Sequence, residues 1–169
     1  MEHHDLNLIF SQAGRLFAES EMLAASVISR TRSSAGLDDR IAARLEKLFD
    51  ANPTACFHAN AMQTAFMRSM CERMEELTHL ANDPGPKNSA LASAGASFGR
   101  EEIERVYTTG ESRKTTFNHR MHATIDELLE GENASSSRRT EAFVVFSRAA
   151  VRSMTTAAAL VQAPIAGYA

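Results

Sequence analysis

The chain has 169 residues, a hydrophobic fraction of 44% and a net charge of −3 at pH 7. This length and composition predict one folded domain with a sizeable core, and the slight acidic balance argues against a general binder of nucleic acid or of anionic membranes. Two cysteines are too few for a disulfide framework, and residues 2–5 are polar where a signal peptide would be apolar. No apolar run approaches the roughly 20 residues of a membrane-spanning helix. We therefore expect a cytoplasmic protein with neither nucleic acid nor a membrane as partner.

The first 36 residues contain two amphipathic segments. Apolar residues recur at helical spacing over residues 4–18, where Gly14 is a weak spot that costs about 1 kcal/mol relative to alanine in a helix interior. A second helix is expected to start near Ser20, to use Met22, Leu23, Val27 and Ile28 as its apolar side, and to end at residues 33–36. We expect residues 1–36 to form an N-terminal helical extension.

The next two helices are the most clearly marked. Asp38 or Asp39 is suited to cap a helix whose apolar positions are Ile41, Leu45, Leu48 and Phe49, and the Asn52-Pro53 pair interrupts it. Residues 60–80 contain no Gly or Pro, and one helical face follows steps of three and four through Met62, Phe66, Met70, Arg73, Leu77 and Leu80. Cys71 lies beside this face, and its simplest interpretation is a buried thiol in a core helix.

The second half of the chain begins at the strongest stop signal, Asp83-Pro84-Gly85-Pro86. The small residues of 89–97 predict a weak helix or a packed loop, and 100–107 predicts a short helix. Two longer helices are expected over 112–130 and 138–162, separated by a polar loop. No segment alternates with period two over a strand length, so the fold class is all-α with seven or eight helices. Their unequal lengths favour a globin-like packing over a symmetric bundle.

Three separated stretches match motifs of a known family in order and at nearly the family's spacing. They are Ser11-Gln-Ala-Gly-Arg15 leading to Glu21-Met22, then Leu48-Phe49 through Pro53 and Asn60 to Cys71-Glu-Arg73, and finally Phe146-Ser-Arg148-Ala149. Together they resemble the phycobiliproteins, the globin-like light-harvesting subunits of phycobilisomes, over nearly the whole chain. The resemblance implies a globin-like, phycocyanin-type fold over residues 37–169, preceded by the N-terminal extension.

The resemblance also implies a cofactor site. Phycobiliproteins attach a linear tetrapyrrole, a bilin, through a thioether to a helix cysteine, and Cys71 and Arg73 match that cysteine and the arginine two residues on. Asn60 matches the family's Asn-Ala pair. Met74 stands where the family has the aspartate that holds the pyrrole nitrogens, and Arg68 alone lies near the place of an arginine pair. We therefore expect any bilin to be bound weakly and mostly without a covalent bond.

This pattern resembles the divergent phycobiliprotein-like globins of non-photosynthetic bacteria that accompany bilin-biosynthesis genes. It implies a tetrapyrrole-binding or bilin-biosynthesis-associated accessory protein, not an enzyme and not an antenna subunit. Its partners would be a bilin, bilin-biosynthesis enzymes and a second copy packed through the N-terminal helices. Haem is the weaker alternative, because it needs an axial ligand and only His58 and His79 are placed to supply one.

Two further interpretations stay open. The first is an all-α ligand-binding regulatory or interaction module without a tetrapyrrole, although the sequence has no helix-turn-helix. The second is a metal site, at the Glu76-x-x-His79 pair or on the face that carries His119, His122 and Asp126. A di-iron bundle needs a second Glu-x-x-His copy, which is missing. The histidine face is better explained as a solvated helix surface.

Overall fold

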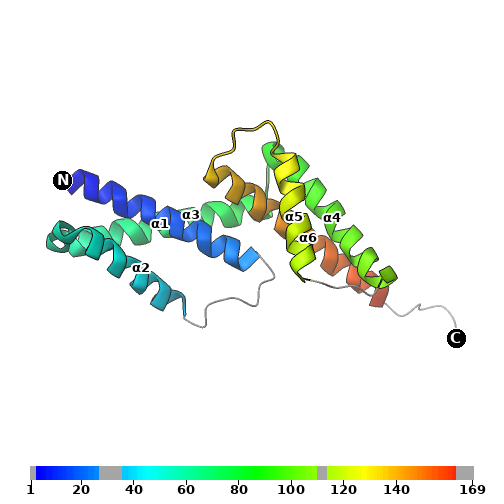
Figure 1. Cartoon of the computed structure of the whole chain (residues 1–169), viewed down its shortest axis with the longest axis horizontal. Helices are drawn as coiled ribbons and strands as arrows, with labels where there is room; N and C mark the ends of the chain where they lie inside the picture. The colour runs from blue at the N-terminus through cyan, green and yellow to red at the C-terminus, as the bar shows by residue number, and fades with distance from the viewer. Residues whose placement is uncertain (1–2, 27–35, 110–113, 163–169) are drawn as a thin grey trace. The chain divides into compact units, whose positions relative to one another are not determined.

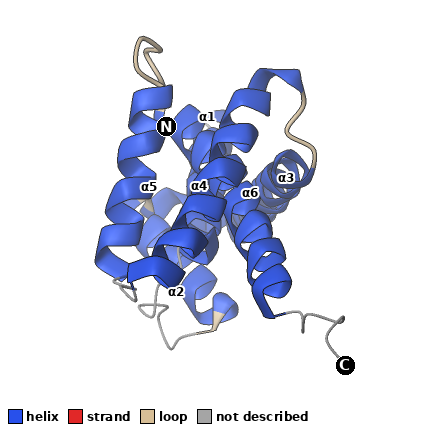
Figure 2. Ribbon diagram, turned by 90° about the vertical axis from the view of Figure 1, so that its right-hand side faces the viewer, coloured by secondary structure: helices blue, strands red, loops and turns tan. Residues whose placement is uncertain are grey.

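The computed structural model describes residues 3–26, 36–109 and 114–162, and within these ranges the chain is helical with no strand (Figure 1, Figure 2). The all-α prediction is therefore confirmed, whereas the globin-like arrangement stays a prediction. The described residues contain six α-helices and two short 3₁₀ helices: α1 (His3–Ser26), α2 (Leu37–Ala51), η1 (Pro53–His58), α3 (Ala59–Asn82), η2 (Pro86–Asn88), α4 (Ser89–Thr109), α5 (Lys114–Leu128) and α6 (Ser136–Gln162).

The helix count of seven or eight is wrong for the described residues, because two pairs of expected helices are continuous. α1 runs through Ser20 without a break, and the neighbouring Ala18 and Glu19 are buried, so tertiary contacts hold this part of the helix. The expected apolar positions Val27 and Ile28 lie outside the described residues. α4 likewise runs unbroken through the small residues of 89–97, for which the sequence left a weak helix or a packed loop open.

The contacts between residues divide the chain into two compact units. In its described part, the first unit contains residues 3–25 and 36–76, and the second contains 26, 77–109 and 114–162. The predicted boundary between an extension, 1–36, and a globin-like domain, 37–169, stays a prediction. No helix in the described part of the chain combines the length and the apolar character needed to cross a membrane.

The first unit is organised around the apolar face of α3. The predicted core positions from Met62 to Leu77 are buried, with Met62 and Phe66 at 0% exposure and Met70 at 3%, whereas Leu80 is half-buried. Rings from the other helices complete this core: Phe10 of α1 lies 5.0 Å from Phe49 of α2, centroid to centroid. The periodicity of residues 60–80 thus predicted the buried side of this helix correctly.

Gly14 permits a close approach of two helices in the first unit. A Cβ atom at Gly14 would lie 2.2 Å from the carbonyl oxygen of Phe66. No ordinary contact allows that distance, so α1 and α3 touch backbone to backbone at this point. The residue that weakens the helix in isolation is the one that allows the two helices to pack.

The second unit contains two similar close contacts, in which glycines of α4 approach the backbone of α6. Cβ atoms at Gly95 and Gly99 of α4 would lie 2.4 Å and 2.3 Å from the carbonyl oxygens of Phe146 and Ala150 of α6. Phe98, between the two glycines, packs its ring against Phe146 with centroids 5.5 Å apart. Close packing against α6 therefore explains why this small-residue segment is a full helix.

Candidate functional site

One face of α3 carries most of the residues that the sequence marks as cofactor-binding. Asn60, Thr64, Arg68 and Cys71 follow one another at steps of four, four and three, which places them on one side of a helix. All four are exposed. At 1.5 Å per residue, the stripe from Asn60 to Cys71 is about 16 Å long. We call these four residues the α3 stripe.

A groove of about 460 Å³ lies between the N-terminal part of this stripe and α1. Polar side chains form most of its lining: Asn7 and Ser11 from α1, and Asn60, Thr64, Arg68 and Ser69 from α3. The hydroxyl of Thr64 donates to the carbonyl oxygen of Asn60 at 2.7 Å. The structure thus brings two predicted site residues, Asn60 and Arg68, into one groove, with Cys71 one turn further along the helix.

Arg73 lies on the opposite, buried side of α3. Its Nε and Nη2 atoms donate to Oε1 of Glu19 at 3.0 and 2.8 Å, and these two side chains are only 5% and 8% exposed. Its Nη1 donates to Oε2 of Glu76 at 3.0 Å. The guanidinium therefore joins α1 to α3 inside the first unit, and the structure separates it from the exposed Cys71.

Glu76 connects this buried pair to the surface. Arg15 of α1 donates to it at 3.1 Å through Nη2. Burial by itself raises the pKa of the Glu76 carboxyl, but the hydrogen bonds from Arg73 and Arg15 and their positive charges outweigh burial and hold that pKa below its usual range. Glu76 is consequently a carboxylate at neutral pH, engaged by two arginines.

The prediction of a buried thiol is wrong, because Cys71 is exposed, and so is Cys56 of η1. The buried arc of α3 passes through Met70 and Arg73, and Cys71 points away from it. An exposed thiol is open to reagents and ligands, which a core thiol is not. Because Cys71 is exposed, a ligand on the surface of α3 can reach its thiol.

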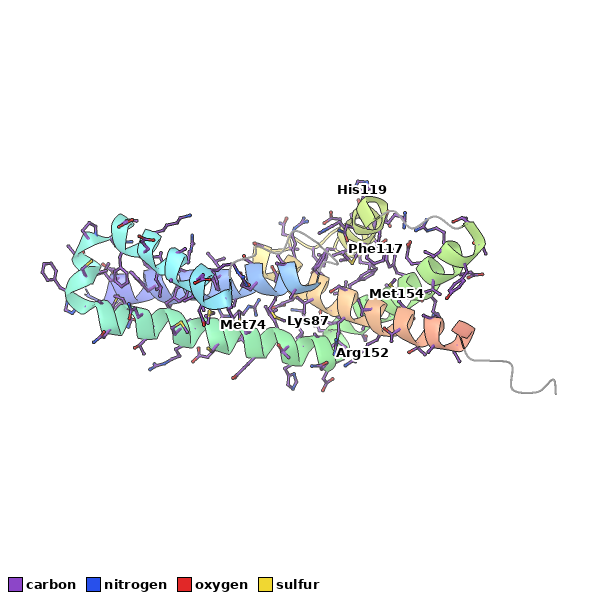
Figure 3. The ribbon with its side chains drawn as sticks, turned by 90° about the horizontal axis from the view of Figure 1, so that it is seen from below. Met74, Lys87, Phe117, His119, Arg152 and Met154 are labelled. Carbon is purple, nitrogen blue, oxygen red and sulfur yellow. The ribbon has the colours of Figure 1, made fainter. Side chains whose placement is uncertain are left out.

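Two other predicted positions lie elsewhere. Met74, at the place of the family's aspartate, is half-buried against the core of the first unit (Figure 3). His79 is exposed near the C-terminal end of α3, within the second unit. His58, the other histidine considered for haem, is exposed in η1. His79 is not among the residues that line the groove beside α1.

Two of the residues considered for metal binding, His122 and Asp126, have other contacts. Asp126 accepts a hydrogen bond from Nη1 of Arg139 at 2.7 Å, and the ring of His122 lies 4.8 Å from that of Phe143. Among the described residues, no group of three or more His, Cys, Asp or Glu side chains is arranged to hold an ion.

The sequence did not identify Glu19 as the partner of Arg73, or Asn7 and Ser11 as residues that line the groove. Arg73 on an apolar helix face was a signal that a buried acid must lie opposite, since a buried charge needs a partner. Nothing in the local pattern of α1 marks Glu19 as that acid. Asn7 and Ser11 are ordinary polar surface residues until the fold places them beside α3.

Comparisons with protein-family models, with curated proteins and with solved structures find no match to this chain.

Proposed function

We propose that this chain is a phycobiliprotein-like accessory protein that binds a linear tetrapyrrole along the α3 stripe and does not act as an enzyme. The observation that carries the proposal is the exposed thiol of Cys71, one helical turn from the exposed guanidinium of Arg68. A thiolate can attack the vinyl or ethylidene carbon of a bilin, and a guanidinium can pair with its propionate. The ordered resemblance of three sequence motifs supplies the choice of ligand.

In this proposal, Arg68 takes the propionate contact that the resemblance gives to Arg73. The guanidinium of Arg73 already donates to two carboxylates, so redirecting it would leave Glu19 buried without its partner. Arg68 lies at the groove and is exposed. Asn60 and Thr64 add an amide and a hydroxyl that can meet the lactam ends of a bilin.

The same geometry explains why binding should be weak. Met74 offers no carboxylate to the pyrrole N–H groups, and a donor left unpaired in a dry site costs about 1–3 kcal/mol. Although most of the residues that line the groove are polar, about half of its exposed surface is apolar. These residues are mostly exposed, so a ligand would remove little apolar area from water. Covalent capture needs the ring to be held against the thiol, and a loosely held ring reacts slowly.

Self-association is part of the proposal. Leu8 and Leu16 of α1 are 53% and 55% exposed, whereas Leu6 and Phe10 are buried inside the first unit. The exposed leucines are eight residues apart and share one side of the helix. A second copy packed along this side of α1 would cover them.

The exposed tip of η1 favours a second candidate function, an interaction module. Phe57 is 86% exposed, and large aromatic side chains are frequent anchors in protein interfaces. A partner protein that buries Phe57 would make the chain an adaptor without any tetrapyrrole.

A biliverdin titration followed by absorbance tests the first proposal. We expect a saturable spectral change that weakens in Arg68→Ala and is unaffected in Arg44→Ala, an exposed arginine of α2 that does not line the groove. A zinc-fluorescent band on a denaturing gel should be faint and should vanish in Cys71→Ala but persist in Cys56→Ala. Equal spectra for the Arg68 and Arg44 variants would contradict binding at the α3 stripe.

A further inference from the structure

The second unit contains a groove with a different chemistry from the one beside α1. Its volume is about 410 Å³, within the roughly 300–1,000 Å³ typical of small-molecule sites. Its lining is mainly apolar, with Ala92 and Ala96 from α4, Ala149 and Leu160 from α6, and two arginines, Arg100 and Arg152. We call it the α4–α6 groove.

The glycine contacts define the register of α4 against α6, and with it the level of the two arginines along the groove. Gly95 meets Phe146 and Gly99 meets Ala150, so an advance of four residues on α4 matches an advance of four on α6. The two helices are therefore parallel, and their colours advance towards the same end in Figure 1. Continuing this register places Arg100 level with residue 151, so that Arg100 and Arg152 occupy the same level on the two helices.

The charge of these arginines is not neutralised inside the described part of the unit. Nη2 of Arg100 donates to the hydroxyl of Ser97 at 3.2 Å, and Nη2 of Arg152 donates to Oδ1 of Asn82 at 2.8 Å. Both acceptors are neutral, and no Asp or Glu lines the groove. Arg152, labelled on α6 in Figure 3, and Arg100 are both exposed, so an incoming anion can reach them.

The backbone packing keeps the groove open. Alanine side chains line it where larger residues would fill it, and they are half-buried at positions 92, 96 and 149. The backbone contacts at Gly95 and Gly99 hold α4 and α6 at a fixed close distance. The groove is therefore largely formed before a ligand arrives, which reduces the ordering cost of binding.

We infer that the α4–α6 groove binds a long-chain fatty acid, with its carboxylate between Arg100 and Arg152 and its hydrocarbon chain along the alanines. Guanidinium groups bind carboxylates through short, charge-assisted hydrogen bonds. From residue 145 to residue 160, α6 offers about 22 Å of groove wall, which suits an extended chain. This inference is independent of the tetrapyrrole proposal, since its residues belong to the other unit.

A fluorescent fatty acid, dansyl-aminoundecanoic acid, tests the inference below its micelle concentration, with the full chain and with oleate as competitor. The chain has no tryptophan, so its own emission interferes little. We expect saturable enhancement that oleate reverses and that oleyl alcohol of the same length reverses at least about tenfold less well, because the alcohol lacks the charge-assisted contacts.

Variants locate the site. Arg100→Ala with Arg152→Ala should weaken binding at least tenfold, and Thr156→Glu should do the same by placing a carboxylate one turn from Arg152 inside the groove. Arg148→Ala and Thr155→Glu are the matched controls, since both residues are exposed on α6 outside the groove lining. The four substituted positions on α6 are all exposed, so we expect every variant to keep its fold: Arg148, Arg152, Thr155 and Thr156. Circular dichroism shows whether the helical content is unchanged.

Three results would overturn the inference. One is an affinity that the groove variants leave unchanged, and another is equal competition by the acid and the alcohol. The third is that biliverdin displaces the probe more strongly than oleate does, and that this displacement depends on Arg152. That result would assign the groove to a tetrapyrrole instead.

Discussion

Nη2 of Arg73 lies 2.8 Å from Oε1 of Glu19, and both side chains are almost completely buried between α3 and α1. Two opposite charges removed from water stabilise each other, and removing one leaves the other with a desolvation cost that is less well compensated. The pair therefore ties α1 to α3, and it occupies the guanidinium of Arg73.

Removing one partner should be more damaging than removing both. We expect Glu19→Ala to lower the free energy of unfolding by about 3–5 kcal/mol, and Glu19→Leu combined with Arg73→Met to restore most of that loss. Urea unfolding followed by circular dichroism measures both. Arg15→Ala, which breaks the exposed pair with Glu76, is the control and should cost at most about 1 kcal/mol. A double variant as unstable as Glu19→Ala would contradict this assignment.

Gly14 should not tolerate even the smallest side chain. We expect Gly14→Ala to lower stability by about 1–3 kcal/mol, although alanine is the better helix former, because its Cβ would displace the backbone of Phe66. Gly36→Ala is the matched control, since a Cβ there meets only the Asp39 carboxylate at an ordinary 3.5 Å. Thermal unfolding of the two variants gives the comparison, and a stabilised Gly14→Ala would show that the two helices do not touch there.

The second unit should lose stability in acid through Glu102. Burial raises the pKa of its carboxyl, but hydrogen bonds and charges from Arg120 and Arg105 outweigh burial and lower that pKa. A lowered folded-state pKa means that the stabilisation is complete above the unfolded value of about 4.3 and is lost as the pH falls through the folded value. Glu102→Gln should therefore be less stable at pH 7, and the difference should shrink below pH of about 4.

Melting temperatures measured from pH 7 to pH 3 test this dependence. Glu104→Gln, an exposed neighbour on α4, is the control and should follow the unsubstituted chain at every pH. A difference between Glu102→Gln and the unsubstituted chain that stays constant down to pH 3 would show that ionisation of Glu102 is not responsible.

Self-association should depend on the exposed leucines of α1. We expect a concentration-dependent dimer in sedimentation velocity, and we expect Leu8→Glu with Leu16→Glu to make it a monomer, because a buried unpaired charge is costly. Leu37→Glu, at a leucine of α2 that is 41% exposed, serves as the control. A dimer that survives both α1 substitutions would place the contact elsewhere.

The sequence predicted the features that depend on local pattern. Helical periodicity marked Met62, Phe66 and Met70 as core, and all three are buried. It could not predict contacts between distant segments. From the local sequence, Gly14 looked only like a weak spot in a helix. The reason for a glycine there is the close backbone of Phe66, which is far away in the sequence.

The candidate site shows the same limit. Arg73 was visible as a charge on an apolar face, but its partner lies 54 positions away. We predicted a buried Cys71 because free cysteines are usually buried. Its position around the axis of α3, however, directs its thiol to solvent. Asn60 and Arg68 were named separately from the resemblance, and only the fold places them in one groove.

A linear tetrapyrrole bound along the α3 stripe should shield the thiol of Cys71, so a thiol-protection measurement is the sharpest test of the proposed binding. Cys56 and Cys71 are both exposed in the same unit, so each reports its own surroundings. The rates of alkylation by N-ethylmaleimide are followed by mass spectrometry with and without biliverdin. We expect biliverdin to slow the alkylation of Cys71 and to leave that of Cys56 unchanged, and we expect Arg68→Ala to remove the protection. Equal rates at Cys71 with and without saturating biliverdin, or equal protection of both cysteines, would contradict the proposed binding.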